Sequence, residues 1–185
     1  VKLWNIGAEG QIFLGAIAVN FIYINTQFNS PSFHILVLLL AGFVGGSVCI
    51  LIPAITKVVF GVNEIITTLL TNYIVFGVTI FLINGPWKDP KSLNFPAAAY
   101  VGEEVFLPTV FGKLSFGFLI CILFTFVAHY LKNKSVFGFE MRIAGGSAMT
   151  AIYAGINAKQ KAFIAMLIGG GFDGLAGAIE LLSQT

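Results

Sequence analysis

Residues 34–55 read HILVLLLAGFVGGSVCILIPAI, and this stretch decides the fold class of the chain. It contains no Asp, Glu, Lys or Arg. At a rise of about 1.5 Å per residue, a helix of this length crosses a bilayer hydrocarbon core of about 30 Å. Because backbone polar groups in lipid need partners inside the protein, only a helix or a closed barrel can place such a stretch in a membrane.

Further apolar runs lie at residues 11–28, 65–84, 114–131 and 162–182. The run at 11–28 is the weakest, since Asn20, Asn25 and Gln27 interrupt it. None of the runs has the alternating pattern of about ten residues that marks a barrel strand. We therefore predict an all-α fold, a polytopic transmembrane helix bundle with about five spans.

The composition agrees with a membrane protein and excludes other classes. Hydrophobic residues make up 57% of the chain and charged residues 10%, whereas soluble domains have roughly 25% charged residues. The net charge of +2 is small and dispersed, which argues against a nucleic-acid-binding surface. Cys49 and Cys121 each lie in an apolar run and share no disulfide, metal-ligand or redox spacing.

The two ends of the chain indicate a piece of a longer protein. The sequence begins at Val1 without a signal-peptide pattern and stops at Thr185 directly after an apolar run. Nothing in the composition suggests a second domain. We expect residues 1–185 to form a single transmembrane domain that is a fragment of a longer polypeptide.

The distribution of Lys and Arg predicts the orientation of the spans, because cytoplasmic loops are enriched in both residues. One set of alternate loops contains Lys2, Lys57, Lys132, Lys134, Arg142, Lys159 and Lys161, and the other contains Lys88, Lys91 and Lys113. The first set is predicted to be cytoplasmic. Residues 85–113 then form an external loop, with Pro86, Pro90, Pro96 and Pro108, and with Trp87 and Tyr100 suited to the headgroup layer.

Small residues form two pairs within the predicted spans. Gly42 and Gly46 are four residues apart, as are Gly170 and Gly174, so each pair lies on one helix face and permits close approach of another backbone. Packing between spans of one subunit is the favoured interpretation, and a dimer interface is the alternative.

The predicted cytoplasmic segment 132–161 lies between two apolar runs and belongs to neither. Gly145 and Gly146 supply flexible backbone there, and Ser147 is a good N-cap residue. Gly155 suits the position just after a helix, and Asn157 suits the N-cap of the next helix. The pattern predicts a helix of about two turns at residues 148–154, joined by a tight turn to the last span.

This short helix has an apolar side that needs a cover. Isolated helices of under about 12 residues rarely persist in water, yet Met149, Ile152 and Tyr153 make one side of this helix apolar. The spacing alone leaves two interpretations open. The helix folds back on the bundle or lies in the membrane interface, or it docks to a separate soluble partner.

The residues around this helix resemble a known family. RIAG at 142–145, followed by AIYAGI at 151–156, is similar to the cytoplasmic loop in membrane subunits of bacterial ABC importers, in particular the permeases for ribose-type sugars, nucleosides and branched-chain amino acids. Further stretches that resemble the nucleoside and simple-sugar branch are NIGAEGQ at 5–11, NEIITTLLTNYI at 63–74, GPWKDP at 85–90 and GLAGAIE at 174–180. Together these stretches cover most of the chain.

The resemblance implies a permease domain in the bacterial cytoplasmic (inner) membrane, a transport subunit rather than an enzyme. The partners that it implies are an ATP-binding cassette subunit, an extracytoplasmic substrate-binding protein, a second permease subunit in a homo- or heterodimer, and membrane lipid. It makes the short helix a coupling helix that enters a groove of the ATPase. In this coupling loop Arg142 would anchor the chain, Gly145 and Gly155 would shape the ends of the helix, Met149, Ile152 and Tyr153 would dock, and Ser147 and Ala151 complete the set.

Polar residues in and near the spans are candidates for a substrate pathway, because transporter sites often lie where a span is broken near the midplane. The stretch 5–11, with glycines on both sides of Glu9, is the best candidate for such a break, and an interfacial helix cap is the alternative. Thr68 and Asn72 carry uncharged groups that suit a sugar or nucleoside, although interhelical hydrogen bonding also explains them. The candidate pathway residues are Asn5, Glu9, Gln11, Thr68 and Asn72.

Asp173 departs from the family pattern, which has a small residue at this position. An Asp near the centre of a span costs about 2.5–3.5 kcal/mol on insertion scales. We therefore expect Asp173 to face protein rather than lipid, with a substrate contact as a weaker hypothesis.

Neither a catalytic site nor a metal or cofactor site is predicted. The sequence has no discernible Ser/His/Asp or Cys/His set, and the glycines at 169–171 lack the Lys-Ser/Thr of a phosphate loop, so ATP hydrolysis belongs on a partner. The rival functions are an ATP-independent secondary transporter or channel, which calls for paired ionisable residues such as Asp173 and Glu180, and a non-transporting scaffold. The expected substrate is a nucleoside or simple sugar, before a branched-chain amino acid.

Overall fold

The computed structural model describes residues 3–26, 28–89, 101–112 and 114–183. This part of the chain is mostly helical, which confirms the all-α prediction. The helices are α1 (Ala8–Asn25), α2 (Pro31–Phe60), α3 (Glu64–Asn84), α4 (Phe116–Lys134), α5 (Val136–Gly146), α6 (Ala148–Tyr153) and α7 (Ala158–Leu182). Between α3 and α4 lie a 3-10 turn, η1 (Glu103–Val105), and an antiparallel pair of short strands, β1 (Thr109–Phe111) and β2 (Leu114–Ser115).

Four of the described helices, α2, α3, α4 and α7, are long and apolar enough to cross a membrane. They correspond to four of the predicted runs and confirm a polytopic helix bundle. The fifth run forms α1, an 18-residue helix that is not among these four. Its sequence carries the polar residues Glu9, Gln11, Asn20 and Asn25.

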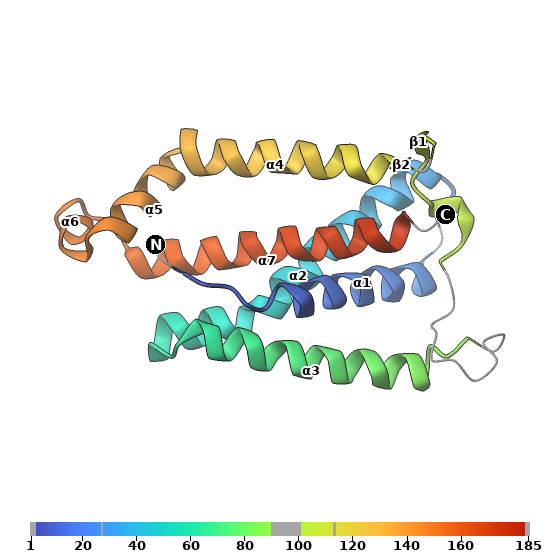
Figure 1. Cartoon of the computed structure of the whole chain (residues 1–185), viewed down its shortest axis with the longest axis horizontal. Coiled ribbons are helices and arrows are strands. Elements are labelled where there is room, and N and C mark those ends of the chain that lie inside the picture. Colours follow the sequence, from blue (N-terminus) through green and yellow to red (C-terminus); the bar gives the residue numbers. More distant parts are fainter. Residues whose placement is uncertain (1–2, 27, 90–100, 113, 184–185) are drawn as a thin grey trace.

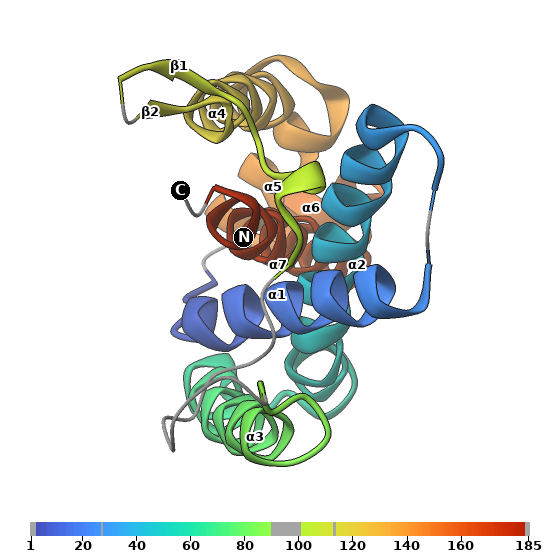
Figure 2. The same ribbon diagram turned by 90° about the vertical axis from the view of Figure 1, so that its right-hand side faces the viewer.

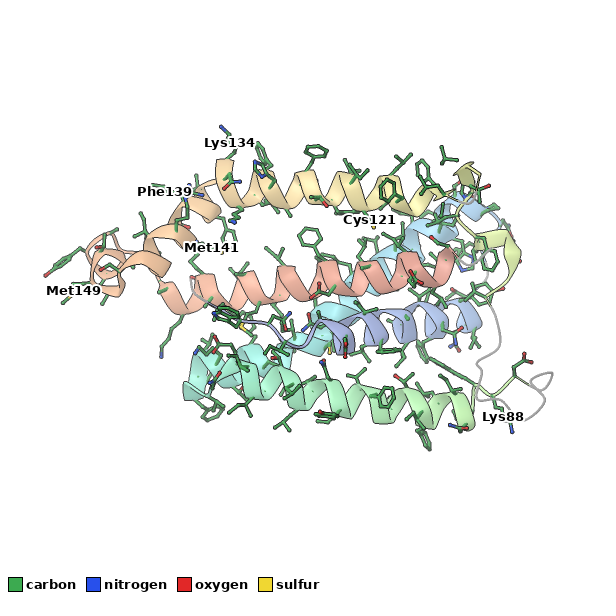
Figure 3. All side chains as sticks on the ribbon, in the orientation of Figure 1. Lys88, Cys121, Lys134, Phe139, Met141 and Met149 are labelled. Carbon is green, nitrogen blue, oxygen red and sulfur yellow. The ribbon has the colours of Figure 1, made fainter. Side chains whose placement is uncertain are left out.

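The long helices lie side by side, and α1 begins about midway along α7 and runs obliquely to it (Figures 1 and 2). Figure 2 shows α4 on one side of α7, and α1 and α3 on the other. We name one end of the bundle the basic end; it holds the ends of α2 and α4, the helices α5 and α6, and the start of α7 (Figure 1). The described basic residues at this end are Lys57, Lys132, Lys134, Arg142, Lys159 and Lys161. Lys88 lies at the opposite end (Figure 3), so the structure groups these residues as the loop pattern predicts.

The centre of the bundle is built on glycine contacts between α1, α2 and α7. A Cβ atom added to Gly174 would lie 2.6 Å from the Cα of Gly46, and one added to Gly15 would lie 2.6 Å from the Cα of Gly174. A Cβ on Gly170 would lie 2.8 Å from the carbonyl oxygen of Gly46. The three backbones approach this closely because glycine has no side chain. The predicted packing between spans of one subunit is therefore confirmed for these glycines.

The segment 101–107, which we name the strap, packs across the end opposite to the basic end. Val105 and Leu107 are buried in one cluster with Leu38 of α2 and Leu182 of α7. The Leu107 N–H also donates to the Leu182 carbonyl at 2.8 Å. The strap thus ties the ends of α2 and α7 together.

Part of the predicted external loop 85–113 is therefore packed rather than free. Tyr23 of α1 donates its hydroxyl proton to Glu104 of the strap at 2.7 Å, and this bond lowers the pKa of the exposed Glu104 carboxyl below its ordinary value. The remaining loop predictions lie outside the described residues, namely those on Pro90, Lys91, Pro96, Tyr100 and Lys113.

Candidate functional site

The short helix predicted at residues 148–154 is present as α6, with Ala154 as its C-cap. Ser147 is the N-cap, and its hydroxyl accepts a hydrogen bond from the Thr150 N–H at 3.3 Å. Gly155 follows with a φ of 68°, in the left-handed region that glycine adopts without strain. Asn157 caps α7 by accepting from the Gln160 N–H at 3.1 Å. These capping predictions are confirmed.

The predicted flexible backbone before α6 is wrong. Gly145 and Gly146 form the last residues of α5, which begins after Ser135. The Ser135 hydroxyl accepts from the Gly138 N–H at 3.0 Å and so caps this helix. The guanidinium of Arg142 donates to the Lys132 carbonyl in the last turn of α4. This contact agrees with the anchoring role proposed for Arg142.

None of the described residues covers the apolar side of α6. Met149 is 61% exposed, Ile152 70% and Tyr153 84%, whereas Ala151 is 1% exposed. Figure 3 shows Met149 at the extreme tip of the basic end. The helix therefore does not fold back on the bundle with these side chains. A separate partner or the membrane interface remains as the cover.

Residues 3–7, before α1, have no regular secondary structure, whereas residues 8–11 of the predicted break already form the first turn of α1. We name residues 3–7 the break. It runs beside α3, whose side chains satisfy its backbone. The Trp4 N–H donates to Glu64 Oε1 at 3.4 Å, and the Ile6 N–H donates to Thr68 Oγ1 at 3.3 Å. These partners are one helical turn apart, so one face of α3 supports the non-helical segment.

Asn72, one turn further along α3, continues this series of side-chain hydrogen bonds to the break. Its amide nitrogen donates to the Ile6 carbonyl at 3.0 Å, and its amide oxygen accepts from the Gly10 N–H at 2.9 Å. A Cβ on Gly10 would lie 2.6 Å from that oxygen, so glycine is needed where α1 starts against α3. Asn72 thus bridges the break and the first turn of α1.

Asn5 connects the same break to α7. Its side chain exchanges hydrogen bonds with Gln11 at 3.0 and 3.2 Å and donates to Asp173 Oδ2 at 3.3 Å. Asp173 is half-buried and bonded to protein, in agreement with the expectation that it faces protein.

Four of the five candidate pathway residues therefore come together at the break, and the fifth, Glu9, is exposed in the first turn of α1. Gln11 is 1% exposed and Thr68 0% exposed. In this conformation both side chains are therefore buried against the break and hydrogen-bond to it rather than face an open pathway. Thr68 also donates its hydroxyl proton to the Glu64 carbonyl at 2.7 Å. Direct substrate contact by these residues stays a prediction.

Replacing Asn72 with Leu is expected to destabilise the protein. The change leaves the Gly10 N–H and the Ile6 carbonyl without partners, at about 1–3 kcal/mol for each group kept away from water. The full-length protein in detergent should show a lower Tm. Asn84→Leu is the matched control, because the bond that the Asn84 side chain makes within the described residues is to Ile80 of its own helix. Equal Tm values for the two variants would contradict the bridging role of Asn72.

Sequence reasoning missed Glu64, which holds the start of α3. Its carboxylate is buried and forms an ion pair with Lys57 at 2.7 Å, while its other oxygen accepts from the Trp4 N–H. The visible signal was Asn63, which caps α3 by accepting from the Ile65 N–H at 3.0 Å. Such a cap predicts where α3 starts, but it does not predict that Glu64 pairs with Lys57 of α2.

The described residues do not form a metal site. Among them, no three His, Cys, Asp or Glu side chains lie close enough to hold an ion. The break offers hydrogen bonding through amide and carboxylate groups, and α6 offers an exposed apolar side.

A family comparison assigns the chain as a whole to a class of proteins. The family that matches residues 1–185 is described as "Branched-chain amino acid transport system / permease component". The chain belongs to this permease family. Together with the four apolar helices, membership identifies part of a multi-pass membrane transport subunit rather than an enzyme.

Individual relatives are permeases of ABC transporters. The guanosine ABC transporter permease protein NupP of Bacillus subtilis is 31% identical over 96% of this chain and 52% of the relative. The glucose ABC transporter permease protein TsgB13 of Haloferax volcanii is 30% identical over 97% and 50%, respectively. The nucleoside ABC transporter permease protein NupB of Lactococcus lactis is 27% identical over 97% and 52%.

The chain spans about half the length of these relatives. No solved structure matches it.

Proposed function

We propose that this permease chain is the membrane-spanning part of an ATP-driven importer for a nucleoside or a simple sugar. The observation that carries the proposal is the uncovered apolar side of α6, at the tip of the basic end. A short capped helix with exposed Met149, Ile152 and Tyr153 is suited to a groove on a soluble partner. That partner is an ATP-binding cassette subunit in this proposal.

In this mechanism ATP binding draws two ATPase subunits together, and α6 passes the movement to the spans. The spans then switch between outward- and inward-open states. Such coupling requires that the two states differ in their free energy of interaction with the ATP-loaded partner. The caps at Ser147 and Gly155 give α6 the defined shape that this difference needs.

The break before α1 is the proposed substrate pathway. Its exposed Asn5 amide and half-buried Asp173 carboxylate offer donor and acceptor groups to hydroxyls of a ribose or hexose. Glu9 and Asn72 flank the same pathway, and Gln11 and Thr68 hold the break in position through their hydrogen bonds to it. Asp173 would give up its bond to Asn5 when substrate binds.

The relatives support the substrate class. Guanosine and nucleosides are named for two of them and glucose for the third. The family description adds branched-chain amino acids, which also carry an ammonium group and an apolar side chain. The amide side chains at the break offer both donors and acceptors, which suit the hydroxyl groups of nucleosides and sugars.

The remaining partners follow from the same proposal. An extracytoplasmic binding protein delivers the substrate at the end that carries the strap, and a second permease subunit, identical or different, completes the pathway. The location is the bacterial cytoplasmic membrane, with the basic end in the cytoplasm, as the Lys and Arg distribution predicts.

Transport by the full-length protein tests the function. The protein is reconstituted in proteoliposomes with its ATPase and binding protein, and uptake of labelled guanosine is measured with ATP inside. We expect ATP-dependent uptake that unlabelled nucleosides or simple sugars reduce and leucine does not. Competition by leucine alone would overturn the substrate assignment, and uptake without ATP would favour the ATP-independent alternative.

A further inference from the structure

Helix α5 connects the end of α4 to α6 in the chain and also contacts the first turn of α7 (Figure 1). Its start is fixed to the end of α4. A Cβ on Gly138 would lie 2.5 Å from the carbonyl carbon of Lys132, and Arg142 donates to the carbonyl of the same residue. The first turn and the middle of α5 therefore both contact the last turn of α4.

A second contact fixes α5 to the first turn of α7. Lys161 Nζ lies 2.5 Å from Glu140 Oε2, and the two side chains are 22% and 26% exposed. The Lys161 ammonium also lies 5.6 Å from the centre of the Phe137 ring. Partly buried pairs are screened less than surface pairs, and the aromatic face adds to the attraction.

The two spans differ in how firmly they hold the rest of the bundle. In α7, 50% of the most apolar 18-residue stretch is buried, whereas in α4 only 6% of the corresponding stretch is buried. Moreover, the glycine contacts at Gly174 hold the α7 backbone against those of α1 and α2. A displacement that reaches α7 therefore moves three helices, whereas one that reaches α4 moves mainly α4.

We propose that Glu140, Lys161 and Phe137 form a brace that passes movement of α6 to α7, and through α7 to α1 and α2. The inference rests on the proposed function of α6 as the coupling helix. Glu140 and Lys161 are positioning residues in it, since they act through the orientation of α5. Without the brace, α6 still docks, but its movement reaches α7 only through the turn at residues 154–157, and α5 turns about its contacts with α4 instead of moving with α7.

The brace can be removed from either side by uncharged substitutions. Glu140→Gln and Lys161→Met each abolish the ion pair, and the double variant Glu140→Lys, Lys161→Glu restores it with exchanged charges. Lys159→Met is the matched control, because it removes one positive charge from the same turn of α7 at an exposed position outside the pair. All variants are made in the full-length protein and assembled with its ATPase and binding protein.

Three measurements separate transmission from folding and docking. They are the amount of ATPase that co-purifies, the rate of ATP hydrolysis and the rate of ATP-dependent uptake. In the single variants we expect unchanged co-purification and hydrolysis, with uptake lowered about fivefold or more, the lower bound for typical coupling between sites. The exchanged pair should regain most of the uptake, and Lys159→Met should match wild type.

The outcomes distinguish the brace from the permease assignment. Unchanged uptake in both single variants overturns the brace and leaves the proposed function intact. Loss of ATPase binding in the single variants also overturns it, because the pair then serves docking. If the single variants do not fold, the double variant with exchanged charges decides. A double variant that folds but shows no uptake overturns the brace. A wild-type protein that neither binds its ATPase nor transports with ATP overturns the proposed function itself.

Discussion

Replacing both Met149 and Ile152 with Glu in the full-length protein is expected to abolish ATPase binding and ATP-dependent uptake together. Both side chains are mostly exposed, so the folded bundle does not need them. Burial of one such side chain at an interface stabilises the complex by about 1.5–3 kcal/mol. Losing the burial of both side chains is expected to weaken binding by about 3–6 kcal/mol, which raises Kd by at least about a hundredfold. The new carboxylates add a desolvation cost to this loss.

Co-purification of the ATPase with wild type and variants checks this expectation. The matched control is Thr150→Glu with Ala154→Glu, which adds the same charge to exposed positions away from the apolar side of α6. We expect the control to retain binding. Binding that survives in the Met149, Ile152 variant would show that these side chains do not dock. A wild-type protein without any ATPase binding would instead favour an ATP-independent carrier.

The ends of α6 could be predicted because helix caps are local. Ser147 and Asn157 bond backbone groups three residues ahead, and Gly155 adopts its φ without help from distant parts of the chain. The same reasoning gave the long apolar helices, whose length and hydrophobicity are read directly from the sequence.

Helix α5 was missed because distant contacts stabilise it. Gly145 and Gly146 have low helix propensity, which predicts flexible backbone. The ion pair of Glu140 with Lys161 and the bond from Arg142 to α4 outweigh that preference. No spacing rule predicts either contact from one sequence.

The candidate pathway was predicted in part. Residue type and resemblance brought Asn5, Gln11, Thr68 and Asn72 to attention, and the structure places them together. The partners were out of reach, because Asn72 bonds Gly10 across 62 residues and Asn5 bonds Asp173 across 168. Sequence reasoning finds polar groups in a membrane segment, but the fold decides whether they face a pathway or support a backbone.

Replacing Gly174 with Ala is expected to disrupt the α1–α2–α7 unit of the full-length protein. The new Cβ would lie 2.6 Å from the Cα of Gly46, which belongs to a helix backbone and has no alternative rotamer. Overpacking of a core typically costs about 1–3 kcal/mol, and backbone contacts place this case at the upper end or above. Lower yield of monodisperse protein and a lower Tm are the expected results, with uptake reduced accordingly.

Gly169→Ala on the same helix is the matched control and should change stability in the opposite direction. A Cβ there meets nothing within 4 Å, because Gly169 lines a hollow between α7 and α4. Ala is favoured over Gly in a helix by about 1 kcal/mol, so Gly169→Ala should raise Tm. Opposite shifts from one substitution at two positions of α7 would separate close backbone packing from helix propensity. If Gly174→Ala also raised Tm, the three backbones would not be in contact, and α7 would not move α1 and α2 as one unit.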